Sequence, residues 1–182
     1  MIILVDMDDV LEPLLEYWVA ALNRKGGTYI EPDYIARWDI TSFFPHLSRE
    51  EIMEPLMSSA IWDVIPPKAH SVEVLKKVVG CGHTVRIVTA THPDHVQDKV
   101  RWLTATYPFL TWEDVVIASD KSLIHGDIII DDGAHNLERS PCRIKFLFDM
   151  PHNRHWNEEK HGATRVCSWV EIHEEMKKIG VM

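Results

Sequence analysis

The feature that most constrains the fold is the alternation of short apolar runs with longer amphipathic segments, which becomes regular from residue 69 onward. This pattern is typical of strands that alternate with helices. Strands that are apolar on both faces indicate a buried parallel sheet. The strand-like runs lie at residues 2–5, 84–88, 114–118, 127–130, 143–148 and 164–168. We therefore predict an α/β fold, in which helices cover both faces of a Rossmann-like parallel sheet through right-handed crossovers.

Helices are expected where apolar residues recur at helical spacing, at residues 11–24, 70–79, 93–106 and 169–179. Residues 30–63 instead place aromatic side chains among prolines, without a strand pattern, which favours short helices and loops. Because this stretch separates the first strand from the second, we expect a small helical cap at residues 11–68. Residues 1–10 and 69–182 would then form the α/β core.

Charge and composition narrow the function classes. The chain of 182 residues has 28 acidic and 19 basic residues and a net charge of −9, which disfavours a stable nucleic-acid partner or an anionic membrane surface. No apolar run is long enough for a membrane-spanning helix. The three cysteines have no metal-ligand spacing, which favours reduced thiols and a cytoplasmic location. The sequence leaves the oligomeric state open.

Polar side chains follow four of the predicted strands, at the point where each strand ends. They are Asp6, Asp8 and Asp9, then Thr89, then Lys121, and finally Asp131 and Asp132. Each one alone is commonly a turn former, a helix cap or a solvated charge. Because parallel strands end at the same edge of a sheet, we expect them to meet there. Crowded carboxylates repel one another without a cation, and hard oxygen ligands favour Mg²⁺.

This combination of groups predicts phosphoryl chemistry. An ionised Asp6 can attack phosphorus, and Asp8, two residues further along, can face the same crevice. Asp8 can protonate the leaving oxygen and later deprotonate the attacking water. Thr89, nearby main-chain N–H groups and Lys121 would hold the phosphoryl oxygens as charge moves in the transition state.

The same residues resemble a known superfamily. The sequence DMDDVL from Asp6, then Thr89, Lys121 and the pair Asp131-Asp132 match, in order, the four motifs of the haloacid-dehalogenase-type phosphohydrolases. Longer stretches resemble the 5′(3′)-deoxyribonucleotidase family. They are SDKSLIHGDIIIDD at 119–132, LFDMPHNRH at 147–155, SWVEI at 168–172, and the run that holds Lys99, Arg101 and Trp102.

The resemblance implies a role for each matching residue. It makes Asp6 the nucleophile and Asp8 the general acid and base, with a phosphorylated small molecule, a nucleotide, as the substrate. It implies that Mg²⁺ is bound by Asp6, the main-chain carbonyl of Asp8 and Asp132, with Asp131 as a neighbour in the metal site. Phosphate would be bound by Thr89, the Ala90 amide and Lys121.

The sequence departs from the family pattern at several positions. Asp9 stands where the first motif often has glycine, and Ala90 stands where serine is common. Leu14 occupies the position at which family members place an aromatic residue that stacks on the nucleobase. Trp38 lies where the cap aromatics of the family fall. We therefore take Leu14 and Trp38 as candidate substrate-binding residues.

Other aromatic and histidine side chains leave two interpretations open. Phe43, Phe44 and Trp62 could stack on a base or could pack within the cap itself. His152 and His155 form an HxxH pattern, but no glutamate or cysteine completes a zinc site, so an outer wall of the pocket or a solvated loop is favoured.

Three other functions compete with a nucleotidase. The same chemistry could act on another small phosphometabolite, such as a sugar phosphate. A phosphoacceptor signalling domain also combines acidic residues, threonine and lysine, but its phosphoacceptor aspartate ends a middle strand. A non-catalytic binding protein would have no need of Asp6, Asp8, Lys121 and Asp132 together.

Overall fold

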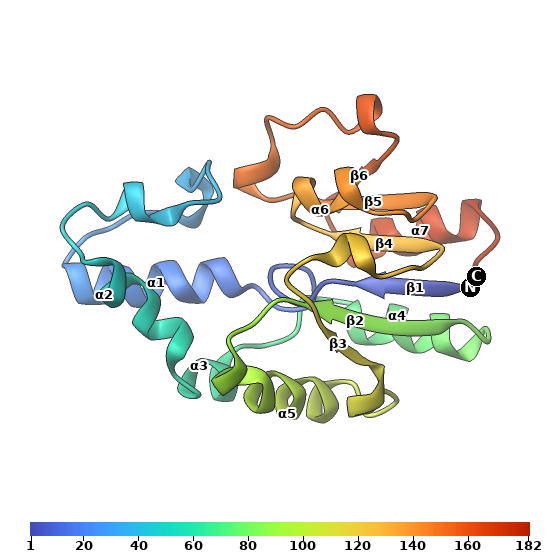
Figure 1. Ribbon diagram of the computed structural model, residues 1–182, viewed down its shortest axis with the longest axis horizontal. Coiled ribbons are helices and arrows are strands. Elements are labelled where there is room, and N and C mark those ends of the chain that lie inside the picture. The colour runs from blue at the N-terminus through green and yellow to red at the C-terminus, as the bar shows by residue number, and fades with distance from the viewer.

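The computed structural model describes residues 1–182 and contains a six-stranded sheet in the order β3-β2-β1-β4-β5-β6. Every neighbouring pair is parallel, which confirms the predicted α/β class (Figure 1). The strands are β1 (Ile2–Val5), β2 (Thr84–Thr89), β3 (Val115–Ile117), β4 (Ile128–Asp131), β5 (Ile144–Phe148) and β6 (Thr164–Val166). The chain adds β2 and β3 on one side of β1 and then β4, β5 and β6 on the other. In such folds ligands bind at the carboxyl ends of the strands where the order changes, which here are β1 and its neighbours.

Helices cover both faces of the sheet because side chains alternate along each strand. Ile3 and Val5 of β1 face a large cluster that includes residues of α4 (Ser71–Gly80), α5 (Val96–Thr106) and α7 (Trp169–Lys178). Leu4, between them, faces a smaller cluster on the opposite side. That cluster contains Leu137 of α6 (Ala134–Arg139). Alternate residues of one apolar strand therefore supply two cores.

Residues 11–68, which we call the insert, leave the sheet after β1 and return at α4. The insert contains α1 (Leu14–Gly26), α2 (Arg49–Met53) and α3 (Ala60–Val64), which lie beyond the carboxyl ends of the strands (Figure 1). Part of it packs around its own apolar cluster, with Phe44 at full burial. Trp62 joins the main core cluster instead. The boundaries of a separate cap domain stay a prediction.

Several helix boundaries differ from the sequence expectation. Helix α1 begins at Leu14 rather than at residue 11, because a tight turn follows β1 and Pro13 precedes the first helical residue. It ends at Gly26, two residues beyond the expected end, and Gly27 follows in the left-handed conformation at φ 62°. Helix α6 was not predicted, because it has six residues and only Leu137 among them is buried. No helix has both the length and the apolar character needed to cross a membrane.

Candidate active site

The chain turns sharply after β1, and Asp9 makes that turn possible. Asp9 is buried and lies in the left-handed region at φ 59°. Its Oδ1 accepts a hydrogen bond from the Leu15 main-chain N–H at 2.9 Å, near the start of α1. Aspartate tolerates this conformation better than most residues. The residue that replaces the usual glycine therefore keeps the turn and fixes the first turn of α1.

We expect Asp9→Ala to lower the free energy of unfolding by about 1–2 kcal/mol more than Asp9→Gly does. Both variants lose the same carboxylate and its hydrogen bond, so their difference isolates the cost of placing a Cβ atom at positive φ. Urea denaturation of the two variants measures that difference. Equal stabilities would show that the turn relaxes and that Asp9 is not conformationally required.

Lys121 lies between two carboxylates at the strand ends. Its Nζ is 2.7 Å from Asp6 Oδ1 and 2.7 Å from Asp131 Oδ2. Burial raises the pKa of Asp6 well above its ordinary value, while the Lys121 charge acts in the opposite direction. Burial alone would lower the pKa of Lys121, but the charges of Asp6 and Asp131 outweigh it and the pKa is raised. Lys121 is therefore a fixed cation beside Asp6.

Asp131 and Asp132 have different surroundings although they are adjacent. Asp131 Oδ1 accepts hydrogen bonds from the Gly133 N–H at 2.7 Å and from Asn136 Nδ2 at 3.0 Å, while its Oδ2 is held by Lys121. Burial, and next the charge of Asp131, raise the pKa of Asp132 to about 8. Carboxylate oxygens of Asp6, Asp131 and Asp132 lie within 4.8 Å of one another. This buried acidic triad is a candidate metal centre.

Lys99 of α5 lies in the site beside Asp8, although no role in the site was predicted for it. Its Nζ lies 2.6 and 2.7 Å from the two carboxylate oxygens of Asp8 and donates to Thr89 Oγ1 at 3.0 Å. Lys99 is only 4% exposed. In the sequence, Lys99 differs from other helix lysines only by its place in the run that resembles the family pattern. Helical spacing alone does not predict that it reaches the site.

Glu12 is a second buried acid near Asp8, and the sequence did not single it out. It is fully buried, and neither carboxylate oxygen has a hydrogen-bond partner. Burial, and next the charge of Asp8, raise its pKa well above the ordinary value for glutamate. Asp8 therefore lies between a buried cation and a buried carboxyl group.

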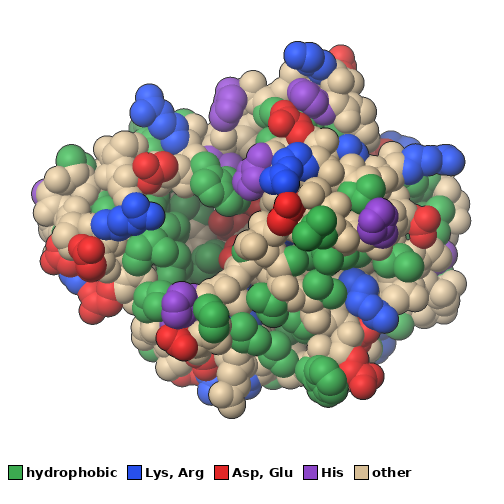
Figure 2. Space-filling view, in the orientation of Figure 1, with side chains coloured by type: hydrophobic (Ala, Val, Ile, Leu, Met, Phe, Trp, Pro, Cys, Tyr) green, Lys and Arg blue, Asp and Glu red, His purple; other side chains and the backbone are tan.

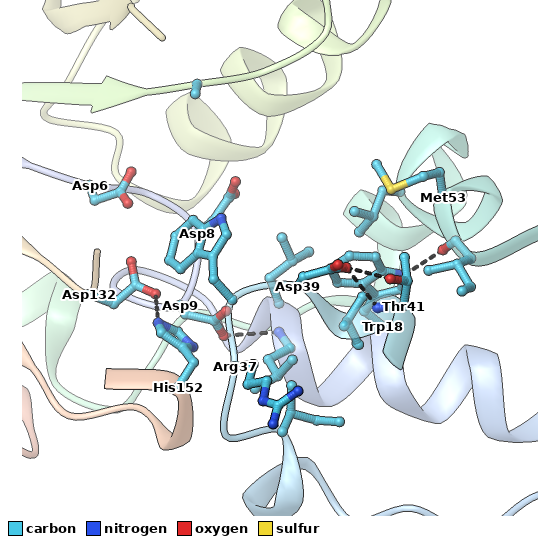
Figure 3. A pocket seen from close by; sticks show the side chains of 18 of the residues that line it. Asp6, Asp8, Asp9, Trp18, Arg37, Asp39, Thr41, Met53, Asp132 and His152 are labelled. Carbon is cyan, nitrogen blue, oxygen red and sulfur yellow. Dashed lines mark hydrogen bonds and ion pairs between the residues drawn. The ribbon is translucent and has the colours of Figure 1, made fainter. Parts of the chain in front are cut away.

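A cavity of about 670 Å³ opens between the strand ends and the insert. Its floor holds Asp6, Asp8, Lys121 and Asp132, and the insert supplies most of the apolar wall. Figure 2 shows the molecule hollowed there, with hydrophobic side chains along the hollow and acidic ones deep within it. In Figure 3 the carboxylates of Asp6, Asp8 and Asp132 gather at one end and Trp18, Thr41 and Met53 lie at the other.

The candidate substrate-binding residues separate into two groups. Leu14 and Trp38 both line the cavity, and so does Ala90. Phe44 and Trp62 are buried in apolar clusters, and Phe43 packs against the cluster of the insert. Of the aromatic residues considered, Trp38 is therefore the one that lines this cavity. His152 also lines the cavity, in agreement with its expected place in the pocket wall.

The fold is similar to that of solved haloacid-dehalogenase-type hydrolases. A haloacid dehalogenase family hydrolase from Deinococcus radiodurans R1, solved with phosphate and sodium, superimposes with a TM-score of 0.67 at 14% identity, covering 99% of this chain and 96% of that one. A crystal structure described as a putative β-phosphoglucomutase from Thermotoga maritima superimposes with a TM-score of 0.62 at 14% identity, covering 98% of this chain and 99% of that one. The architecture is thus that of the haloacid-dehalogenase-type hydrolases.

Sequence comparison identifies the family within that class. Residues 1–179 match the family model described as 5′ nucleotidase, deoxy (pyrimidine), cytosolic type C protein. The 5′(3′)-deoxyribonucleotidase of Bacillus subtilis (strain 168) is 35% identical over 179 residues, covering 94% of this chain and 95% of the relative. That of Clostridium acetobutylicum is 28% identical over 153 residues, covering 84% of each. The chain belongs to this nucleotidase family and is a phosphoric monoester hydrolase, as the resemblance implied.

Proposed function

We propose that the protein is a Mg²⁺-dependent 5′(3′)-deoxyribonucleotidase that hydrolyses deoxyribonucleoside monophosphates through a phosphoryl group carried on Asp6. One observation carries the proposal. The Asp6 carboxylate is fixed by Lys121 at 2.7 Å and by the Met7 N–H at 2.7 Å, at the polar floor of a cavity whose other walls are largely apolar. A nucleophile with an adjacent cation suits the phosphate, and the apolar wall suits a nucleoside.

The donor set fits a hard divalent cation. The floor and its surroundings contain buried Asp6, Asp9, Asp131 and Asp132 and two buried cations, Lys99 and Lys121. Burial raises the pKa of Asp9 to about 8. Such a surplus of carboxylates is relieved by a cation, and oxygen-only ligands favour Mg²⁺. We propose Asp6, Asp132 and the main-chain carbonyl of Asp8 as its ligands. Bound Mg²⁺ would offset the charge of the phosphate and keep Asp6 ionised.

Asp131 has a different proposed role from the other carboxylates. Both of its oxygens already accept hydrogen bonds, from Lys121, Asn136 and the Gly133 N–H. We therefore propose that Asp131, a neighbour of the metal site, acts mainly by holding Lys121 toward Asp6. Lys121, the Ala90 amide and Thr89 would bind the phosphoryl oxygens.

The reaction proceeds in two displacements at phosphorus. A carboxylate oxygen of Asp6 forms a bond to phosphorus while the bond to the nucleoside oxygen breaks, and protonated Asp8 gives its proton to that leaving oxygen. The nucleoside departs. Asp8, now ionised, takes a proton from a water molecule whose oxygen attacks phosphorus, which breaks the Asp6–phosphorus bond and releases phosphate. Asp6 is then regenerated as a carboxylate and Asp8 as an acid.

The experiment that tests this function is phosphate release from a panel of 5′- and 3′-deoxyribonucleoside, ribonucleoside and sugar monophosphates, with Mg²⁺ and with EDTA. We expect turnover that requires Mg²⁺ and is fastest on deoxyribonucleotides, because their base and deoxyribose match the apolar wall. Turnover confined to sugar phosphates would contradict the nucleotide proposal while preserving the aspartyl chemistry.

We expect Lys121→Met to lower kcat/KM by about 10²–10³-fold, because it removes a preorganised cation that faces the developing charge. Lys145→Met is the matched control, since Lys145 donates to the Leu137 carbonyl at 2.7 Å and does not line the cavity. Both variants are assayed with the same deoxyribonucleotide, below their measured unfolding temperatures. An unchanged kcat/KM for Lys121→Met would remove Lys121 from the phosphate site.

A further inference from the structure

We propose that His152 positions Asp132 for metal binding and that Trp38 of the insert holds His152 in place. This inference rests on the proposed function, because it takes Asp132 to be a metal ligand. It assigns His152, the first of the two histidines of the LFDMPHNRH stretch, to the metal site and connects that site to the wall proposed to face the nucleoside.

The main chain of Asp132 is fixed by Asn153, the neighbour of His152. The buried Asn153 amide donates from Nδ2 to the Asp132 carbonyl at 2.8 Å and to the Phe148 carbonyl at 2.8 Å. Its Oδ1 accepts from the Met150 N–H at 3.2 Å and from Arg165 at 2.8 Å. The two Nδ2 contacts tie the short turn η7 (Pro151–Asn153) to the ends of β4 and β5, and the Arg165 contact ties it to β6.

The side chain of Asp132 contacts His152 itself. His152 Nε2 lies 3.0 Å from Asp132 Oδ2, as drawn in Figure 3, and this buried nitrogen has no hydrogen-bond partner, so the contact is a close polar approach. Both side chains are more than nine-tenths buried. Asp132 Oδ2 thus faces His152, while a carboxylate oxygen of Asp132 lies within 4.8 Å of oxygens of Asp6 and Asp131, the other members of the acidic triad. Groups that hold a metal ligand in this way commonly contribute 10–100-fold to metal affinity, as an order of magnitude.

Trp38 braces this histidine from the insert. Its ring centroid lies 4.9 Å from those of His152 and His135, with interplanar angles of 88° and 82°. These are edge-to-face contacts, which are favourable for aromatic rings. Trp38 is nevertheless 61% exposed and lines the cavity. A ligand that contacts Trp38 therefore touches the group that holds His152.

A second contact crosses from the insert to the same turn. Arg154 pairs with Asp33 of the insert at 2.8 Å and with Asp149 at 3.3 Å. The loop that carries Trp38 is thus attached to the turn that carries His152 at two points. Because Trp38, His152 and Asp132 are in successive contact, a displaced insert loop would loosen a metal ligand.

Metal binding by the full chain, without substrate, tests the inference. Free Mn²⁺, a spectroscopic substitute with similar oxygen ligands, is measured by electron paramagnetic resonance, with Mg²⁺ as competitor. We expect His152→Ala to weaken the binding of both metals by about 10–100-fold. His152→Gln retains a side-chain donor and is expected to recover part of the lost affinity. His155→Ala is the control, because His155 is exposed on the same loop.

A double-mutant cycle tests whether Trp38 acts on the metal site through His152. We expect Trp38→Ala to weaken Mn²⁺ binding several-fold in the wild-type background and to add nothing in the His152→Ala background. Wild-type metal affinity in folded His152→Ala and His152→Gln would overturn the positioning role of His152 while leaving the proposed function intact. An equal effect of Trp38→Ala on Mn²⁺ affinity in both backgrounds would show that Trp38 does not act through His152. Failure of the wild-type protein to bind either metal would instead overturn the metal-dependent function on which the inference rests.

Discussion

Asp6→Asn is expected to lower phosphate release by at least about 10⁴-fold while the protein stays folded. The amide has nearly the same shape as the carboxylate, and its oxygen can still accept from the Met7 N–H and from Lys121, which contact Asp6 Oδ1 at 2.7 Å each. Lys121 also keeps its bond to Asp131. The amide oxygen, however, is a poor nucleophile toward phosphorus, so the first displacement stops.

The measurement is phosphate release from a deoxyribonucleoside monophosphate, beside circular dichroism and thermal unfolding of the same preparation. Asp127→Asn is a suitable control, because the Asp127 carboxylate accepts from the Ile2 N–H at 2.7 Å at the opposite end of β1. We expect that variant to keep wild-type turnover. Substantial activity in folded Asp6→Asn would refute covalent catalysis by Asp6.

Asp8→Asn is expected to lower kcat by about 10²–10⁴-fold, because asparagine can neither protonate the leaving oxygen nor take the proton of the attacking water. The loss has two parts. With p-nitrophenyl phosphate the leaving group needs no proton, so the first displacement is largely restored. The second displacement still lacks its base, and the phosphoryl group is expected to remain on Asp6.

Rapid-quench kinetics with p-nitrophenyl phosphate separates the two parts. We expect a burst of p-nitrophenolate close to one equivalent of enzyme, followed by a slow steady rate. With a deoxyribonucleotide the burst is expected to be far slower. Because Lys99 loses a charged partner at 2.6 Å, the unfolding temperature is measured first. A steady rate equal to that of the wild type with both substrates would exclude Asp8 as the acid and base.

The fold could be predicted from the sequence because the patterns that indicate its strands and helix ends are local and strong. Continuous apolar strands such as residues 128–130 leave few alternatives to a buried parallel sheet, and Gly27 marks the end of α1 by its left-handed conformation. The start of α1 was misplaced because the apolar period continues backward through Leu11, into the turn that Asp9 and Pro13 impose. Helix α6 is too short to give a period.

The candidate site was predictable only where its residues follow strands. Asp6, Lys121 and Asp132 converge because parallel strands end at one edge, and the structure brings them together. Lys99 and His152 reach the same place from a helix and from a turn far along the chain. No spacing rule connects them to Asp8 or Asp132, since those contacts depend on how the helix and the turn pack in three dimensions.

The central claim, that Asp6 carries the phosphoryl group, is tested most directly by peptide mass spectrometry of acid-quenched enzyme. Asp8→Asn is mixed with p-nitrophenyl phosphate and Mg²⁺, and the peptide that contains Asp6 is compared with that of the Asp6→Asn, Asp8→Asn double variant. We expect one phosphoryl group on Asp6 in the single variant and none in the double variant. Phosphate release without any adduct on that peptide, or an adduct that persists in the double variant, would contradict the mechanism.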